Sequence, residues 1–122
     1  MSNNKIMVVD DSKAMRMIVR RTLKQAGFNN DVEEATNGAD ALTKIRTEQP
    51  RLVLSDWNMP DMSGYELLTK LREEKINVPF AMITTEGTPD MRAKAQQAGA
   101  LFLIQKPFTP EELARAVGTV LK

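Results

Sequence analysis

The sequence predicts an α/β protein in which five parallel strands form one doubly wound sheet with five helices on its two faces. Two observations predict this fold. Five short apolar runs alternate along the chain with five stretches whose apolar residues recur at helical spacing. The short runs are also largely apolar throughout, and such strands are typical of a parallel sheet that helices cover on both sides.

The composition indicates one globular domain and excludes several kinds of site. The chain has 122 residues, of which 42% are hydrophobic and 27% are charged, so we expect a single domain over residues 1–122 without an output domain. A net charge of +1 creates no strong field toward nucleic acid or an anionic membrane. Without cysteine or histidine, the chain has no disulfide, no thiolate metal site and no histidine base.

The start of the chain, residues 1–5, is polar and lacks the apolar core of a signal peptide. No stretch of the sequence approaches the length needed to span a membrane. We therefore expect a cytoplasmic protein that is a monomer and that binds neither nucleic acid nor membrane.

The first apolar run, residues 5–9, ends on Asp10 and Asp11. Ser12 can then cap a helix that continues to about Ala26. One face of this helix is apolar, and the opposite face is basic and is expected to be solvated. The apolar set is Met15, Ile18, Val19, Thr22, Leu23 and Ala26, and the basic set is Lys13, Arg16, Arg20, Arg21 and Lys24.

The middle of the chain contains the predicted central strand. Residues 31–35 form a weak strand, which we expect at or near an edge of the sheet, and residues 37–49 form a helix that ends before Pro50. The apolar run 52–54 follows and leads to Asp56. Residues 64–74 are predicted to form the next helix.

The fourth strand is predicted at residues 78–83 and leads to Thr84. Thr88 and the proline after it favour a helix start. This helix extends to about Ala98 and has only Met91 as a large apolar residue, so we expect it to be the least firmly held helix.

The fifth strand is predicted at residues 100–104, shortly before Lys106. Residues 109–112 have the pattern of a capping box with proline at the first helical position, and they begin the last helix.

Polar side chains follow four of the five strands. Because the carboxyl ends of parallel strands meet at one edge of the sheet, ligands of open α/β sheets bind there. This edge would collect Asp10, Asp11, Asp56, Thr84 and Lys106, which are far apart in the sequence.

The acidic residues of this set predict a metal site. Carboxylates crowded into one cleft repel each other, and a hard divalent cation bound by oxygen relieves that repulsion. Mg²⁺ fits better than Ca²⁺, which needs more protein oxygens than these positions offer. The candidate ligands are Asp10, Asp11, Asp56 and the backbone carbonyl of Asn58.

The same set suits phosphoryl transfer, in which catalysis is mostly positioning and charge neutralisation. Since histidine and cysteine are absent, the carboxylate of Asp56 is the candidate phosphoryl acceptor. Lys106 would pair with the bound phosphoryl group, and Thr84 would donate a hydrogen bond to it. Each residue also has a structural interpretation, as a helix cap, a surface lysine or a strand end, but their joint occurrence at matching strand ends favours the functional one.

These residues resemble the receiver domains of two-component response regulators over nearly the whole chain. The resemblance depends on Asp10-Asp11, Ser55-Asp56-Trp57-Asn58-Met59-Pro60, Gly64, Thr84 and Lys106-Pro107. It implies the flavodoxin-like strand order 2-1-3-4-5, which receiver domains exemplify, and a cis peptide bond between Lys106 and Pro107. It also implies a signalling domain rather than an enzyme, in which a sensor histidine kinase phosphorylates Asp56 with Mg²⁺ and the phosphate is slowly lost.

Within that family the chain is most similar to stand-alone chemotaxis regulators. This similarity implies a flagellar motor switch protein or another target as partner, and a phosphatase. In the family, the threonine matching Thr84 and the aromatic residue matching Phe102 change position on phosphorylation. They alter the surface of the fourth helix, fifth strand and fifth helix, here about residues 89–120. The chain departs from the common pattern at Phe102, which stands in place of a tyrosine, and at Thr85, which stands in place of an alanine.

Three other functions stay open on the sequence alone. A phosphate sink or relay intermediate would use the same chemistry without a motor partner. A phosphohydrolase with an aspartate nucleophile usually has a second acid two residues later, where this chain has Asn58. A flavin-binding module shares the topology, but the loops do not suggest a pair of aromatic residues around a flavin ring, since Trp57 is a single aromatic residue beside the acid.

Overall fold

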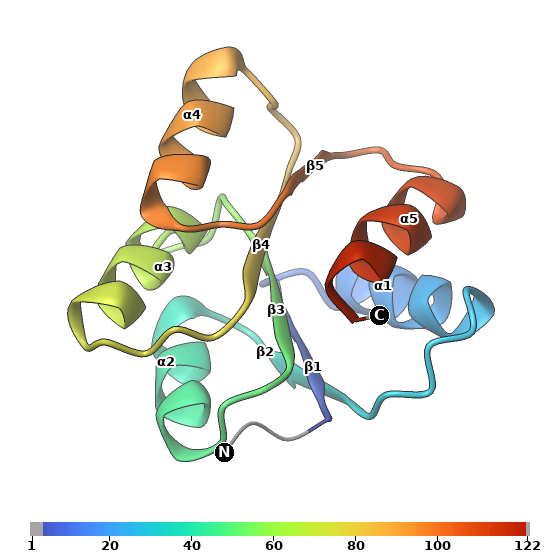
Figure 1. Ribbon diagram of the computed structural model, residues 1–122, viewed down its shortest axis with the longest axis horizontal. Helices are drawn as coiled ribbons and strands as arrows, with labels where there is room; N and C mark the ends of the chain where they lie inside the picture. Colours follow the sequence, from blue (N-terminus) through green and yellow to red (C-terminus); the bar gives the residue numbers. More distant parts are fainter. Residues whose placement is uncertain (1–3, 122) are drawn as a thin grey trace.

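The computed structural model describes residues 4–121, so the first three residues of the predicted polar start (residues 1–5) lie outside the described residues, as does Lys122. Strands and helices alternate along the described chain, as the sequence predicts (Figure 1). The strands are β1 (Ile6–Val9), β2 (Val32–Ala35), β3 (Leu52–Asp56), β4 (Phe80–Thr84) and β5 (Leu103–Gln105). The helices are α1 (Lys13–Gln25), α2 (Gly38–Thr47), α3 (Gly64–Glu73), α4 (Pro89–Ala98) and α5 (Pro110–Leu121).

The five strands are parallel and lie in the order β2-β1-β3-β4-β5, which confirms the predicted doubly wound sheet. β2 lies at one edge, as expected, and β5 lies at the other. The chain reverses its direction of winding between β1 and β3. Open α/β sheets form their binding crevice at this switch point, so the site is expected at the carboxyl ends of β1 and β3.

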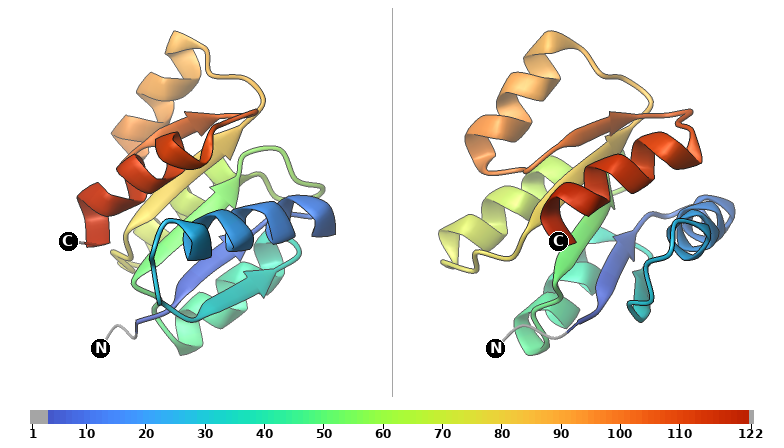
Figure 2. Two further views of the ribbon diagram at one scale, coloured as in Figure 1. Left: turned by 90° about the vertical axis from the view of Figure 1, so that its right-hand side faces the viewer. Right: turned by 45° about the vertical axis from the view of Figure 1, so that its right-hand side comes forward.

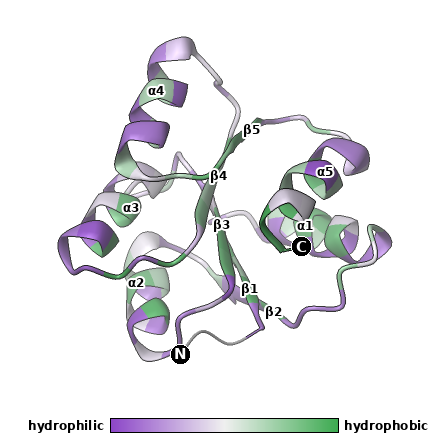
Figure 3. Ribbon diagram, viewed as in Figure 1, coloured by the Kyte–Doolittle hydropathy of each residue, from purple (hydrophilic) through white to green (hydrophobic). Residues whose placement is uncertain are grey.

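Helices cover both faces of the sheet. α1 and α5 pack on one face, and α2, α3 and α4 pack on the other (Figures 1 and 2). Strand residues alternate between these layers: Ile6 and Val8 pack with α1 and α5, whereas Met7 and Val9 pack with the other three helices. β1, β3 and β4 are accordingly buried and largely apolar (Figure 3), whereas the edge strand β2 contains Glu33 and Glu34. None of the helices within residues 4–121 is both long and apolar enough to cross a membrane.

The fifth strand begins later than predicted, at Leu103 rather than at residue 100. The preceding residues still bond to β4, because the Leu101 N–H donates to the Phe80 carbonyl and the Phe102 carbonyl accepts from the Met82 N–H. The Leu101 side chain, however, is 55% exposed. The first part of this apolar run is therefore an edge connection rather than a strand buried on both faces.

Two residues of α1 lie on the face opposite to the one predicted. Ile18 was expected in the core but is 47% exposed. Arg16 was expected in solvent, but its side chain is only 11% exposed because its Nε pairs with the Glu34 carboxylate of β2 at 2.7 Å. This ion pair turns Arg16 toward the edge of the sheet. The buried residues of the helix are Val19, Thr22 and Leu23.

Candidate functional site

Three carboxylates meet at the carboxyl ends of the two central strands. Asp10 and Asp11 follow β1, and Asp56 ends β3. One carboxylate oxygen from each residue lies within 4.8 Å of the other two. Asp10 is 3% exposed and Asp56 is 8% exposed, whereas Asp11 is open to solvent. The fold thus brings together acids that the sequence separates by more than forty residues.

Local hydrogen bonds fix the position of Asp10. Its Oδ1 accepts from the Ser12 N–H at 2.9 Å, and Ser12 is the N-cap of α1. The Asp10 carbonyl accepts from Nη1 of Arg16 at 2.7 Å. Arg16 is itself held by Glu34, and the guanidinium groups of Arg16 and Arg20 hold the pKa of Glu34 below its ordinary value. The Asp10 carboxylate is therefore held in place by the start of α1 and by the edge strand.

The loop after β3 places Asp56 beside the start of α3. The Gly64 N–H donates to the Trp57 carbonyl at 2.8 Å. A Cβ atom at residue 64 would lie only 2.3 Å from the Asp56 carbonyl oxygen, so this close approach requires glycine. Trp57 also stacks on Tyr65, with ring centroids 5.6 Å apart and an angle of 12° between the planes. The loop is thus packed against the helix that follows it.

Lys106 brings a positive charge to the two buried acids. Its Nζ lies 3.3 Å from Oδ2 of Asp10 and 3.4 Å from Oδ1 of Asp56, and its side chain is 12% exposed. The Lys106 N–H donates to the Thr84 carbonyl at 2.6 Å, which fixes the end of β5 against the end of β4. The peptide bond between Lys106 and Pro107 is cis, as the family resemblance implies.

Burial and the charge of Asp10 raise the pKa of Asp56 above its ordinary value of 3.8. Lys106 and the Asn58 N–H, which lies 3.4 Å from Oδ1 of Asp56, oppose this shift because they stabilise the charged carboxylate. The net direction is upward, so the negative charge at this edge is only partly compensated by the protein itself.

Thr84 lies at the same edge, on the adjacent strand β4, and is fully buried. Its Oγ1 accepts from the Glu86 N–H at 3.1 Å. Thr85 is exposed. Asn58, the remaining predicted metal ligand, follows Asp56 by two residues and contacts it through its N–H.

Phe102 does not lie beside Thr84. Phe102 packs with the α1 and α5 layer, whereas Leu103 packs with the α2, α3 and α4 layer. Thr84 shares the strand alternation of Phe80 and Met82, which pack with the α2, α3 and α4 layer. The sheet therefore separates the Phe102 ring from the Thr84 side chain.

The residues at this edge fit a hard divalent cation. The donors are carboxylate oxygens, two of them buried and repelling each other, and such a set suits Mg²⁺ rather than Zn²⁺. One carboxylate from each of three residues also leaves room for waters and a phosphoryl oxygen, which Mg²⁺ prefers to keep among its ligands.

Sequence reasoning missed the support that Arg16 and Glu34 give to Asp10. Arg16 has the spacing of a solvated basic face, and Glu34 belongs to a weak strand. Their pairing depends on the parallel register in which Val8 lies opposite Glu34. The one signal in the sequence is the position of Arg16, about one helical turn after the cap residue Ser12.

Comparisons with known proteins agree with the fold and the acidic site. The family model of the response regulator receiver domain matches residues 6–118. A chemotaxis protein CheY homologue of Campylobacter jejuni is 43% identical over 120 residues, which cover 96% of this chain and 92% of the relative. The solved structure of chemotaxis protein CheY4 of Vibrio cholerae has a TM-score of 0.86 at 35% identity and covers 98% of this chain and 100% of that chain. A CheY-like receiver domain protein of Methanospirillum hungatei has a TM-score of 0.84 at 30% identity, covering 97% and 93%.

Proposed function

The chain belongs to the response regulator receiver domain family, and on that basis we propose that it is a phosphorylation switch in which Asp56 is the phosphoryl acceptor. The observation that carries the proposal is the position of Asp56, with Lys106 3.4 Å away and the oxygens of Asp10 and Asp11 within 4.8 Å. A receiver domain is a signalling domain, so the phosphohydrolase and flavin-binding alternatives do not apply.

In the proposed step, a carboxylate oxygen of Asp56 attacks the phosphorus atom of a phosphohistidine on a sensor histidine kinase. The new bond joins that oxygen to phosphorus, and the phosphorus–nitrogen bond breaks. The electron pair stays on the histidine nitrogen. Lys106 pairs with a phosphoryl oxygen, and the Thr84 hydroxyl donates a hydrogen bond to another, since its contact with the Glu86 N–H uses only an acceptor lone pair.

Asp10, Asp11 and Asp56, together with the carbonyl of Asn58, would hold Mg²⁺. When bound, the ion neutralises the charge of the carboxylates and of the phosphoryl oxygens. The carboxylate of Asp10 is prepared for this role, because the Ser12 N–H at 2.9 Å fixes one of its oxygens. Slow loss of the phosphoryl group to water would then reset the switch.

The proposed output surface is formed by α4, β5 and α5, roughly residues 89–120. We propose chemotaxis as the process and a flagellar motor switch protein as the target, with a phosphatase as a further partner. The similarity to a relative that is named as a chemotaxis protein supports this proposal. We also propose that residues 1–122 act as a single receiver domain, as a monomer in the cytoplasm. The switch role that the resemblance gives to Phe102 stays a prediction.

The proposal is tested by incubating the protein with acetyl phosphate and Mg²⁺ and mapping the modified residue by mass spectrometry. We expect one phosphoryl group on Asp56 and none on the Asp56→Asn variant. Asp61→Asn is the matched control, because Asp61 is an exposed acid in the same loop and should leave labelling unchanged. Labelling that survives Asp56→Asn would overturn the assignment.

The roles of Lys106 and of the partner are tested together. Lys106→Ala should still accept the phosphoryl group but should not bind its target more tightly afterwards, because the cation opposite Asp56 is lost. A pull-down with and without beryllofluoride, a mimic of the phosphoryl group, measures this change. Capture of a flagellar switch protein only with the mimic supports the motor role, and capture of the kinase alone indicates a phosphate sink.

A further inference from the structure

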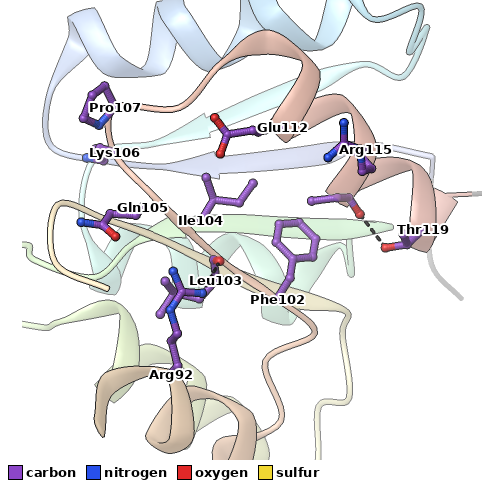
Figure 4. A pocket seen from close by; sticks show the side chains of 11 residues that line it. Arg92, Phe102, Leu103, Ile104, Gln105, Lys106, Pro107, Glu112, Arg115 and Thr119 are labelled. Atoms are coloured by element: carbon purple, nitrogen blue, oxygen red, sulfur yellow. Dashed lines mark hydrogen bonds between the residues drawn. The ribbon is translucent and has the colours of Figure 1, made fainter. Parts of the chain in front are cut away.

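One arginine joins the first turn of α4 to two other segments. Nε of Arg92 donates to the Gly87 carbonyl at 3.1 Å, and its Nη1 donates to the Leu103 carbonyl at 3.3 Å. Figure 4 shows Arg92 reaching from α4 to Leu103, beside an open hollow of about 680 Å³ that lies along β5 and α5. The planar guanidinium therefore links the β4–α4 loop, α4 and β5.

Gly87 permits this contact. A Cβ atom at residue 87 would lie 2.9 Å from Nη2 of Arg92 and 2.9 Å from Oε1 of Gln105. Such distances are too short for a carbon atom, so a larger residue would displace Arg92, Gln105 or the loop. The guanidinium of Arg92 can therefore pack closely against residue 87 because this residue has no side chain.

The same loop is connected to the proposed phosphorylation site. The Glu86 N–H donates to Oγ1 of Thr84 at 3.1 Å, and Gly87 is the next residue. A shift of the Thr84 hydroxyl toward a phosphoryl group on Asp56 would stretch or break its contact with Glu86. The Gly87 carbonyl, which Arg92 holds, would then move with the loop.

Leu103, the β5 residue that Arg92 contacts, packs on the same face of the sheet as Thr84. Leu103 packs with the α2, α3 and α4 layer, toward which Thr84 points by strand alternation. Phe102 packs on the opposite face with α5, and Figure 4 shows its ring on the α5 side of the strand. β4 and β5 also pair directly through their main chains, but the side-chain route from the Thr84 hydroxyl through the loop to α4 and β5 passes through Arg92.

We propose that Arg92 is a positioning residue that transmits a change at Thr84 to α4 and β5, and this inference rests on the proposed function of Asp56. α4 suits such a role because Ala95 is its one buried residue. Its other end is held by Arg72, whose Nη2 donates to the Gly99 carbonyl at 3.3 Å. α4 can then turn about the end held by Arg72 when the contact at Arg92 changes.

The test is a set of two-dimensional ¹⁵N NMR spectra recorded with Mg²⁺, before and after addition of beryllofluoride. In the wild type, amide signals should shift both in the loop (residues 85–88) and in the distant segments (residues 94–98 and residue 103). In Arg92→Ala, the loop signals should shift as before, whereas the distant shifts should be largely lost, because the side chain that joins the loop to these segments is absent. Arg92→Lys, which keeps the charge but not the planar fork, should restore part of the response.

The matched control is Arg115→Ala. Arg115 lines the same hollow, and its replacement by alanine removes the same charge. Among the residues that the structure describes, Arg115 has no hydrogen-bond partner to lose. It should respond like the wild type. Gly87→Ala perturbs the same contact from the loop side, and it should reproduce the loss if Arg92→Ala does not fold.

The outcomes are distinguishable. If the wild type responds and Arg92→Ala or Gly87→Ala passes the full shift to the distant segments, the role of Arg92 is overturned while the function of Asp56 stands. If the wild type shows no shift at any residue, the proposed function fails, and the role of Arg92 fails with it.

Discussion

α3 and α4 have the same length and pack side by side on one face of the sheet, but different interactions hold them there (Figure 1). α3 buries three leucines and begins with a complete capping box between Ser63 and Glu66. α4 buries Ala95 alone. Its two ends are held by arginine side chains that bind main-chain carbonyls.

This difference suggests that α3 provides stability, whereas α4 can change its position when Asp56 is phosphorylated. Each buried leucine contributes roughly 1.5–3 kcal/mol, and a small change elsewhere does not remove that contribution. A hydrogen bond contributes only about 1 kcal/mol, and an exposed one can be exchanged for a bond to water. α3 therefore forms a fixed support beside Asp56, and α4 can move at low cost.

The largest expected effect is on α3. Leu68→Ala removes a fully buried side chain and should lower the free energy of unfolding by about 3 kcal/mol, measured by urea denaturation. Leu101→Ala is the control, because that leucine is 55% exposed and should change stability by less than about 0.5 kcal/mol. Similar losses in the two variants would show that burial does not distinguish these positions.

The next effect concerns the acidic edge that α3 supports. Asp56→Asn should raise the free energy of unfolding without Mg²⁺, by an amount of the order of 1 kcal/mol at neutral pH. The pKa of Asp56 is raised by burial and by Asp10. What Asp56 contributes to the free energy of unfolding is therefore most favourable below its ordinary pKa of 3.8, where its carboxyl group is protonated. This contribution is lost as the pH rises through the pKa of the folded state.

The stability difference between Asp56→Asn and the wild type should consequently widen as the pH rises from about 4 to about 7. Added Mg²⁺ should narrow it, because the cation stabilises the wild-type carboxylates. Denaturation curves across this pH range measure both trends. A difference that shrinks as the pH rises would contradict the direction of the pKa shift.

Ala95→Gly tests how weakly α4 is held. Glycine costs about 1 kcal/mol relative to alanine within a helix. Amide exchange in α4 should accelerate about fivefold, whereas α3 should keep its rates, because weakly held segments open separately from the whole domain. Ala93→Gly, at an exposed position of the same helix, isolates the backbone effect from the loss of burial. Equal acceleration in α3 and α4 would mean that the two helices open as one unit.

The smallest effect is expected at the ion pair that supports Asp10 from β2. Glu34→Gln should lower the free energy of unfolding at neutral pH by less than about 1 kcal/mol, since the pair is partly exposed. Arg16 and Arg20 lower the pKa of Glu34 below 4.5, so its contribution is present above that pH and is lost as the pH falls through the pKa of the folded state. Thermal unfolding at several pH values, with Glu33→Gln as control, would detect this loss. An effect that grows on acidification would be inconsistent with it.

The sheet could be predicted from the sequence because the local hydrophobic pattern and the general rules for parallel sheets agree. Apolar runs located the strands, and the rule that carboxyl ends of parallel strands meet at one edge grouped Asp10, Asp56 and Lys106 correctly. The light anchoring of α4 was also visible, since Met91 is its one large apolar residue and is only half-buried.

Side-chain partners across the sheet could not be predicted in the same way. The Arg16 side chain is largely buried because Glu34 lies within reach, and this depends on strand register rather than on helical spacing. Phe102 and Leu103 are adjacent in the sequence but pack on opposite faces, and the register of β5, in which Leu103 lies opposite Met82, decides which one shares a face with Thr84. Neither helical spacing nor the apolar run fixes that register.

A phosphoryl group on Asp56 is expected to change α4 and to leave α3 in place. The most direct measurement is amide hydrogen exchange in both helices, with Mg²⁺ present, before and after addition of beryllofluoride. We predict altered exchange in α4 and the loop before it, with unchanged exchange in α3. Equal changes in both helices, or a change confined to α3, would show that α4 is not the helix that responds to the phosphoryl group.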